Sequence, residues 1–498
     1  MSKSTQTQDL PALLNAAAAS YMLGRLQEAA ALYSQAAAVA PRDLRPIYSL
    51  AMIDIKLGHL EGARARLQTV LDLDPRHFAA QQNVGAVCQN LNRWQEAADA
   101  YRRALALNPT AVETHFSLAR ALAVLGQVNE AGACYRALAG EPSVRLRALT
   151  RLAVLDPSMI GDADLAWLRR GADDPASVPN ARIEAYFALG QVLEQRGADR
   201  EAFAALVLGN RLKHDALAAS ALVAARPETQ EREHEQAVKY VIDRFDEAFF
   251  SRAVNQAGTS AAPIFIVGMP RCGSTLLEQI LSSHSQVQSL GESAVLSDVI
   301  DRGFADAERS GNWRASSDRY LELMRRRGWQ GVRHFVDKTL ENHLRVGMIH
   351  LMFPKAVILD CWRDPVDTCV ACYRQLFTEG NETLYDLAQI GRAYVRYRHV
   401  MEHWDRVLPG RVFRVEHEKL VADPEVQIRR LVTEVCSLDW EPDCLKFHES
   451  PGSVRTASAA QVRRPIFTTS IGRWRRYADE LGPLFEALGS YAKGTVET

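Results

Sequence analysis

The stretch Pro263–His284, PIFIVGMPRCGSTLLEQILSSH, comes close to a known type of nucleotide-binding loop. Gly268, four residues and then Gly273-Ser274-Thr275 follow the spacing G-x-x-x-x-G-K-[ST], but a serine stands where that pattern has its lysine. Glycines in such a turn let the backbone approach a phosphate, and the N–H groups of the following helix favour an anion. Because the lysine that reaches a γ-phosphate is missing, the loop predicts a phosphate site without a magnesium-bound triphosphate, which disfavours kinases and NTPases.

The side chains around this loop are hydrogen-bond donors that suit a phosphate. Ser274 and Thr275 add hydroxyls, Arg271 adds a charged fork, and Arg363 follows a second apolar strand. Cys272 precedes a helix, where a thiol pKa can fall, although a small residue in a tight turn is the simpler interpretation. Ligands of parallel sheets bind beyond the carboxyl ends of the strands. Strands are expected at Ile264–Val267, Ala356–Cys361 and Arg411–Val415.

The composition indicates a multidomain protein. Its 498 residues are too many for one compact core, and 47% are hydrophobic while 24% are charged. The net charge of −1 disfavours a whole-protein nucleic-acid binder, so we expect no nucleic-acid partner. The first residues lack an apolar run behind a basic start, and no run is long enough to cross a bilayer. We therefore expect a cytoplasmic protein without a membrane span.

The eight cysteines do not form the dense pattern of a disulfide framework. Cys369 and Cys372 make a lone CxxC without a second pair or a nearby HxH. A zinc or redox site remains an alternative, but metal sites need more ligands at suitable spacing. We expect no bound metal.

The N-terminal half repeats. Pro41, Pro75 and Pro109 lie 34 residues apart. In phase with them are small residues at the turn, alanines and large side chains, and this is the pattern of the tetratricopeptide repeat (TPR). Small alanines let two helices approach closely, and proline ends the second helix. The in-phase positions are Gly24, Gly58, Asn92 and Gly126; Ala29, Ala63, Ala97 and Ala131; and Tyr33, Leu67, Tyr101 and Tyr135.

These patterns predict an all-α solenoid followed by an α/β domain with a mainly parallel sheet. The concave face of a TPR solenoid usually binds a peptide or another protein, but the array could equally scaffold the chain or make it dimerise. We expect the solenoid over 8–218, with repeats near 10–43, 44–77, 78–111, 112–145 and 183–216, then a helical linker over 219–260 and the α/β domain over 261–492.

The half from about 262 to 490 resembles the PAPS-dependent sulfotransferases, in particular the tyrosylprotein sulfotransferase branch and its TPR-fused bacterial relatives. In that superfamily, loops like GMPRCGST hold the 5′-phosphosulfate of 3′-phosphoadenosine-5′-phosphosulfate (PAPS). The resemblance implies a P-loop-like fold with PAPS as the co-substrate, an acceptor hydroxyl and no metal. The other matching pieces, in order, are His284 with Gly291-Glu292, Asp337-Lys338, Phe353-Pro354 with Arg363-Asp364-Pro365, His417–Val421, and Thr456–Pro465 with Gly472-Arg473-Trp474.

The resemblance also implies roles for single residues. Glu292 would be the general base, Lys338 and Ser458 would contact the departing phosphate oxygens, and Arg363 would hold the 3′-phosphate. Without the resemblance, Glu292 would be an acid near a helix N-terminus and Lys338 a solvated loop lysine. The implied catalytic residues are Glu292, Lys338, Ser458 and Arg271, and the implied nucleotide-binding residues are Arg271, Cys272, Gly273, Ser274, Thr275, Lys338, Arg363, Ser458 and Arg473.

Two positions depart from the family pattern. Ala371 stands where a serine usually binds the 3′-phosphate, so that contact is lost or is made by a neighbour such as Thr368. Ala294 replaces an arginine that helps the tyrosylprotein branch to bind acidic peptides, which weakens that expectation for this chain.

The leading hypothesis is therefore a sulfotransferase acting on an acceptor hydroxyl, with peptidyl tyrosine as one candidate and the TPR array recruiting the acceptor or a partner protein. The alternative is a TPR interaction module whose sulfotransferase-like domain binds nucleotide but is inactive. The serine at the lysine position disfavours the third hypothesis, a P-loop kinase.

Overall fold

The computed structural model describes residues 9–222, 226–252, 262–377, 381–449, 462, 465–466 and 470–492. The chain divides into two compact units, Met1–Gly161 and Asp162–Thr498, and each is described by itself. The domain boundaries expected from the sequence, at residues 218 and 260, stay predictions.

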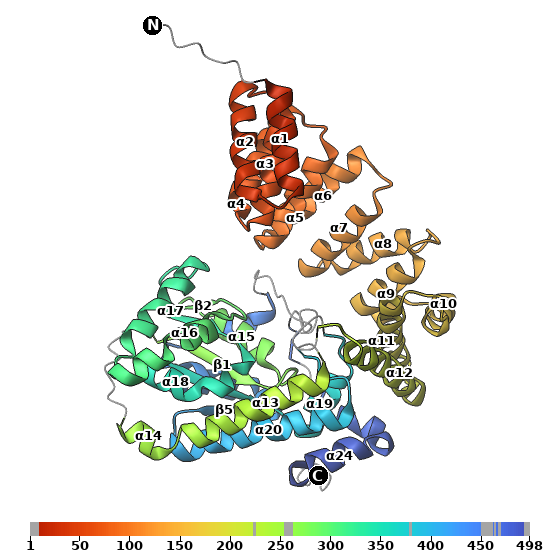
Figure 1. Cartoon of the computed structure of the whole chain (residues 1–498). Coiled ribbons are helices and arrows are strands. Elements are labelled where there is room, and N and C mark those ends of the chain that lie inside the picture. Colours follow the sequence, from red (N-terminus) through yellow and green to blue (C-terminus); the bar gives the residue numbers. More distant parts are fainter. Residues whose placement is uncertain are drawn as a thin grey trace. The chain divides into compact units, whose positions relative to one another are not determined.

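The first unit is a succession of paired helices, as the repeats predict (Figure 1). Its elements are α1 (Leu10–Met22), α2 (Leu26–Val39), α3 (Leu44–Lys56), α4 (Leu60–Leu73), α5 (Phe78–Asn90), α6 (Trp94–Leu107), α7 (Val112–Val124), α8 (Val128–Leu138), α9 (Arg145–Leu155) and the short 3₁₀ helix η1 (Pro157–Met159).

The turn inside each pair explains the in-phase small residues. Gly24, Gly58 and Gly126 have φ angles of 74°, 77° and 78°, a left-handed conformation in which a side chain is strained. Asn92 takes the same conformation with φ of 66°, and asparagine tolerates it better than most residues. The in-phase alanines are fully buried between helices, so the predicted all-α repeat array is confirmed.

Among its described residues, the second unit begins with five helices that precede its sheet. The pair α11–α12 turns at Gly197, whose φ of 76° repeats the turn of the first unit. Further along, α13 lies beside α20 (Leu387–Val407), where Glu231 accepts hydrogen bonds from Arg392 and Arg396. The five helices are α10 (Asp162–Asp173), α11 (Pro179–Gln195), α12 (Asp199–Ala218), α13 (Pro227–Arg244) and α14 (Glu247–Arg252).

The second unit contains a five-stranded, wholly parallel sheet with strand order β2-β3-β1-β4-β5. β1 is central and pairs with β4 from Ile264 opposite Val357 to Gly268 opposite Cys361. The fold predicted from the sequence is confirmed, although β2 and β3 were not expected. The strands are β1 (Ile264–Gly268), β2 (Val287–Ser289), β3 (His334–Asp337), β4 (Val357–Trp362) and β5 (Phe413–Glu416).

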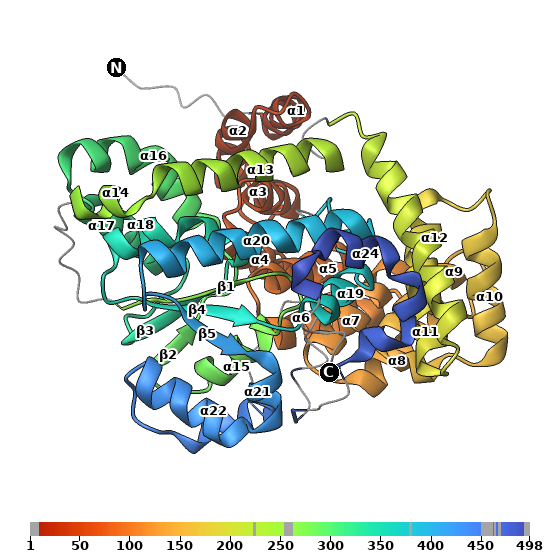
Figure 2. The same cartoon turned by 90° about the horizontal axis from the view of Figure 1, so that it is seen from below.

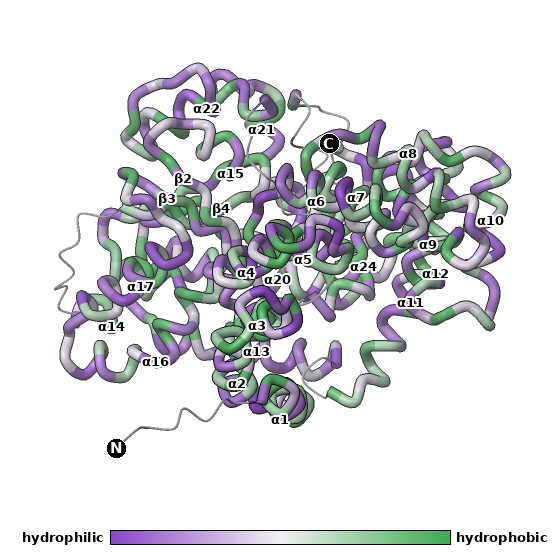
Figure 3. Tube along the Cα trace, turned by 90° about the horizontal axis from the view of Figure 1, so that it is seen from above, coloured by the Kyte–Doolittle hydropathy of each residue, from purple (hydrophilic) through white to green (hydrophobic). Residues whose placement is uncertain are grey.

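Helices cover both faces of this sheet (Figure 2), so the central strand is apolar on both faces. Phe265 and Val267 face the core formed with α16–α20, whereas Ile264 and Ile266 face a core formed with α15 and α22. The strands near the labels β3 and β4 are accordingly hydrophobic in Figure 3, whereas hydrophilic and hydrophobic residues alternate along the helices. The helical elements that follow β1 are α15 (Ser274–Ser282), α16 (Val295–Ser310), α17 (Arg314–Arg326), η3 (Leu340–Arg345), α18 (Val346–Met352), α19 (Pro365–Tyr373), α20 (Leu387–Val407), α21 (His417–Ala422), α22 (Pro424–Arg430), η4 (Leu431–Val435), η5 (Pro442–Glu449), η6 (Arg473–Glu480) and α24 (Gly482–Leu488).

Candidate active site

All five strands deliver a polar residue to the same edge of the sheet. Parallel strands end at one edge, so residues far apart in the sequence meet there. The residues that follow the strands are Glu292 after β2, Lys338 after β3, Arg271 after β1, Arg363 after β4 and His417 after β5.

The loop between β1 and α15 needs both of its glycines. Gly268 and Gly273 have φ angles of 150° and 106°. A Cβ atom at Gly273 would lie 2.6 Å from Nδ1 of His417, and one at Gly268 would lie 2.9 Å from the carbonyl oxygen of Cys361. The backbone is thus held close to its neighbours, and Gly273 is the N-cap of α15, whose first N–H groups face the loop.

Two hollows meet at this loop. The first, called here the arginine hollow, is lined by residues that include Arg271, Arg363, Ala371, Arg374, His417 and Arg473. The second and larger one, called here the glutamate hollow, is lined by residues that include Ser274, Glu292, Arg327, Lys338, Glu341 and His343. Arg271, Gly273 and Thr275 line both hollows, so the loop is their junction.

The arginine hollow concentrates positive charge on side chains that are buried, as Arg363 is, or partly buried, as Arg374 and Arg473 are. Arg363 is held in place because its Nη1 donates to the carbonyl of Arg271 at 3.2 Å and its Nη2 donates to that of Ser470 at 2.7 Å. Burial, together with the nearby Arg374 and Arg363, lowers the pKa of Arg271 to about 10. An anion in the hollow would relieve this repulsion.

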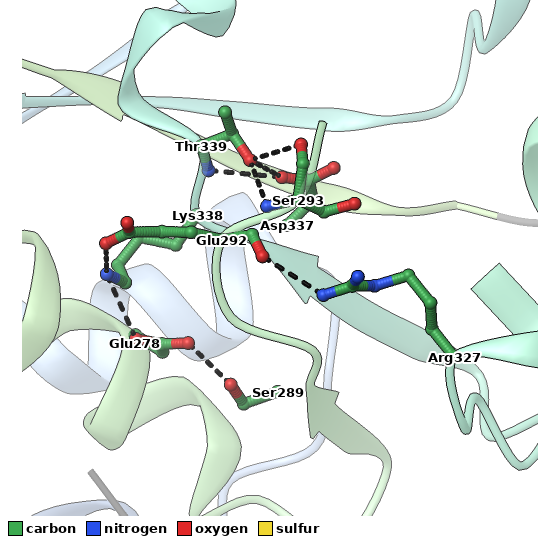
Figure 4. Close-up of polar contacts among 8 residues, drawn as sticks. All are labelled: Glu278, Ser289, Glu292, Ser293, Arg327, Asp337, Lys338 and Thr339. Carbon is green, nitrogen blue, oxygen red and sulfur yellow. Dashed lines mark hydrogen bonds and ion pairs between the residues drawn. The ribbon is translucent and has the colours of Figure 1, made fainter. Parts of the chain in front are cut away.

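In the glutamate hollow, one lysine contacts two carboxylates (Figure 4). Nζ of Lys338 lies 2.6 Å from Oε1 of Glu292 and 3.7 Å from Oε2 of Glu278. The side chains of Lys338 and Glu278 are 2% and 6% exposed, whereas that of Glu292 is 63% exposed. Burial raises the pKa of Glu278, and the hydroxyl of Ser289 donates to its Oε1 at 2.5 Å. Lys338 therefore has one buried and one accessible partner.

A second set of hydrogen bonds fixes the segments that carry this pair (Figure 4). The amide of Ser293 donates to Oγ1 of Thr339 at 2.8 Å, and that hydroxyl lies 2.6 Å from Oδ1 of Asp337. Nη2 of Arg327 donates to the carbonyl of Glu292 at 3.1 Å. The chain around Glu292 is thereby tied to the end of β3.

The sequence-predicted residues lie in different parts of the site, and Arg271, Gly273 and Thr275 line both hollows. Arg363 and Arg473 line the arginine hollow, and Ser274, Glu292 and Lys338 line the glutamate hollow. Cys272 is buried and lines neither hollow; its carbonyl accepts from the thiol of Cys361 at 3.4 Å. Ser458 lies outside the described residues.

Ala371 lines the arginine hollow, as expected for the position where the family has serine. Thr368, the suggested substitute, is buried with its hydroxyl 3.5 Å from the carbonyl of Arg363, and it is not among the described residues that line the hollow. Arg374, three residues after Ala371 on the same side of α19, does line it. This spacing could have indicated from the sequence that Arg374 lies at the site. No pattern among the neighbours of Glu278 in the sequence indicated that residue.

The CxxC pair lies in the interior of α19. Cys369 and Cys372 are buried and free, and burial raises the pKa of Cys372 to about 12. Within the described ranges, no group of three or more His, Cys, Asp or Glu side chains is arranged to hold a metal ion.

Comparison with known proteins agrees with this geometry. Residues 263–442 match the model of the Sulfotransferase family, and residues 20–87 and 78–111 match models of the Tetratricopeptide repeat. The second unit carries a sulfotransferase domain. The match supports sulfotransfer activity in general, and its residues include all five strands and the loops that follow them.

Relatives with similar sequences extend the comparison. An uncharacterized protein of Aquifex aeolicus (strain VF5) is 28% identical over 462 residues, covering 89% of this chain and 58% of that protein. This chain thus spans little more than half the length of that relative. Protein-tyrosine sulfotransferase A of Caenorhabditis elegans is 25% identical over 247 residues, covering 42% of this chain and 60% of that protein.

Among solved structures, that of MamA protein is 18% identical and covers 43% of this chain and 97% of the MamA chain, with a TM-score of 0.28. With so low a TM-score, this match implies nothing about the function of the present chain. Among the described helices, none combines the length and apolar character that a membrane crossing requires.

Two histidines of the sulfotransferase domain, the buried His417 and the partly buried His343, should make the protein labile to acid. Burial, with Arg363 nearby, lowers the pKa of His417 to about 3, and burial lowers that of His343 to about 4. Unfolded histidine titrates near 6.5, so below that pH the unfolded state binds more protons and the free energy of unfolding falls. The expected loss is about 1.4 kcal/mol per pH unit for each histidine, down to the folded pKa.

Urea unfolding at pH 7.5 and pH 5.5 measures this effect. His417→Gln should lose part of the pH dependence. If the free energy of unfolding depends on pH equally in the parent and in His417→Gln, then folding does not lower the pKa of His417 and this prediction is wrong.

Proposed function

We propose that this chain transfers the sulfuryl group of PAPS to an acceptor hydroxyl, with peptidyl tyrosine as the candidate acceptor. The observation that carries the proposal is the junction of the two hollows at the Arg271 loop. One hollow offers arginines for the phosphates of a nucleotide, and the other offers a carboxylate and a buried lysine. A donor in the first and an acceptor in the second would meet at the loop.

Binding of the nucleotide rests on this chain's own donors. The N–H groups at the start of α15, the hydroxyls of Ser274 and Thr275, and Arg271 would hold the 5′-phosphosulfate. Arg363 would hold the 3′-phosphate, since its guanidinium is fixed at the end of β4 by two carbonyls. Ser458 is proposed to donate to the same phosphate oxygens, on the resemblance alone.

In the reaction, the acceptor oxygen forms a bond to sulfur while the bond from sulfur to the 5′-phosphate oxygen breaks. The proton of the acceptor hydroxyl passes to the carboxylate of Glu292, which is accessible in the glutamate hollow. Negative charge grows on the departing phosphate, and the ammonium group of Lys338 offsets it. The products are the sulfated acceptor and 3′-phosphoadenosine 5′-phosphate (PAP).

The candidate acceptor comes from similarity to a protein named for protein-tyrosine sulfotransfer. The TPR array is proposed to recruit that acceptor or a partner protein, since repeats of this kind usually bind peptides. The alternative, an inactive nucleotide-binding domain, is less favoured because Arg271, Glu292 and Lys338 lie together at the strand ends.

The test is calorimetry without magnesium. PAP is expected to bind at least tenfold more tightly than AMP or ATP, because charge-assisted hydrogen bonds to the 3′-phosphate are among the strong ones. AMP measures the value of the 3′-phosphate, and ATP tests for an ordinary nucleotide site. Equal affinities for PAP and ATP would refute the proposed function.

A further inference from the structure

One buried glutamate, on a helix that precedes the sheet in the sequence, contacts two arginines of the arginine hollow. Glu194 lies near the end of α11, and its side chain is 2% exposed. Its Oε1 accepts from Nε of Arg473 at 2.7 Å, and its Oε2 pairs with Nη2 of Arg374. Both arginines line the hollow, although Glu194 itself does not.

The two arginines come from elements that are separate in the sequence. Arg374 caps the C-terminal end of α19, and Arg473 begins η6. With Arg271 and Arg363 they bring four guanidinium groups to one hollow, where like charges repel. A carboxylate shared by two of them keeps that pair together and leaves the hollow with a net positive charge.

Two arginines of the hollow retain unused donors. Within the described part of the chain, Nε of Arg363 and Nε of Arg374 are buried and donate to no acceptor. Buried N–H groups are normally satisfied, so a cluster of such donors in a cationic hollow indicates an anionic ligand. Arg374 also follows Ala371 by one helical turn, on the side where the family pattern would place its serine hydroxyl.

The helix pair that carries Glu194 is packed firmly against the same two elements. Nδ2 of Asn210 on α12 donates to the carbonyl of Tyr373 at 2.9 Å. The ring of Phe203 lies 5.8 Å from that of Tyr373 and 5.1 Å from that of Tyr477, between centroids. The pair α11–α12 therefore braces the ends of α19 and η6, although its sequence has the pattern of a repeat.

We infer that Glu194 is a positioning residue of the nucleotide site, holding Arg374 and Arg473 against the hollow, and that Arg374 makes the 3′-phosphate contact that Ala371 cannot make. This inference rests on the proposed function. The pair α11–α12 is then a part of the nucleotide site and not only the last unit of a repeat array.

The first test compares PAP with AMP, which lacks the 3′-phosphate, by calorimetry on full-length variants. Arg374→Ala should weaken PAP binding by about tenfold to a hundredfold and leave AMP binding unchanged, because only PAP presents the group that Arg374 meets. A structural role would weaken both nucleotides alike. Either that result or an unchanged PAP affinity would overturn the assignment of Arg374.

The second test concerns Glu194. Glu194→Gln keeps the volume but offers one acceptor and one donor, so only one arginine keeps its partner. PAP affinity should fall several-fold even though the hollow becomes more positive, and the loss should be smaller in an Arg374→Ala background, where only Arg473 still depends on Glu194. Tighter PAP binding, or the same loss in both backgrounds, would overturn the positioning role.

Glu201→Gln is the matched control. Glu201 lies on α12 in an exposed ion pair with Arg169, so its loss should not affect either nucleotide. Failure of the proposed function has a different signature: the parent protein would then bind PAP no better than AMP. If the parent prefers PAP and Arg374→Ala retains the full preference, only the present inference fails.

Discussion

Glu292→Gln should lower turnover by about a hundredfold to ten-thousandfold, the usual contribution of one general base. Glutamine keeps the shape of the side chain and can still accept a hydrogen bond from Lys338, but it cannot take up the acceptor's proton. The side chain is 63% exposed and lies outside the arginine hollow, so neither folding nor PAP affinity should change. Single-turnover transfer from radiolabelled PAPS, at saturating donor, measures the effect.

The matched control for this variant is Glu341→Gln. Glu341 is an exposed carboxylate that lines the same hollow, whereas the described carboxylates that pair with Lys338 are Glu278 and Glu292. Its loss should change turnover by a small factor at most. If Glu292→Gln stays within a few-fold of the parent on a folded protein, another residue is the base and the assignment is wrong.

Lys338→Met should also lower turnover strongly, by about a hundredfold to a thousandfold, which is typical for the loss of one group that stabilises a developing anion. It should in addition destabilise the fold. The buried Glu278 loses the cation 3.7 Å away, and removing one partner of a buried pair costs about 3–5 kcal/mol. Transfer rates and urea unfolding, measured on the same preparation, report the two effects.

The destabilisation should depend on pH in a definite direction. Burial already raises the pKa of Glu278, and loss of the lysine raises it further. A carboxyl with a raised pKa is protonated in the folded state while the unfolded state has released its proton. Stability is therefore lost as pH rises from the unfolded value of about 4.3 through the folded pKa, so Lys338→Met should be more unstable at pH 8 than at pH 5.

A double variant separates the two roles of Lys338. Lys338→Met with Glu278→Gln removes the buried charge, so stability should return toward that of the parent while turnover stays low. Recovery of turnover in the double variant would show that Lys338 acts only in folding. Equal stability of the single and double variants would show that Glu278 does not depend on Lys338.

Much of the site could be predicted from the sequence because it is local. The loop from Gly268 to Thr275 is a single turn between a strand and a helix, and its glycines and hydroxyls are consecutive in the chain. The repeats are equally local, since each left-handed turn residue, such as Gly58, is specified by its own helix pair. The sheet was expected from apolar runs, which indicated β1, β4 and β5 but not β2 and β3, which have three and four residues.

Only the tertiary structure brings distant charges together. Glu278 is one of several polar residues in α15 until the strand order places the end of β3 beside it, where Lys338 becomes its partner. Glu194 reads as an ordinary repeat residue until α11 packs against the ends of α19 and η6. The cost of burying a carboxylate makes such partners necessary, but their identity depends on which elements pack together and not on neighbouring residues in the chain.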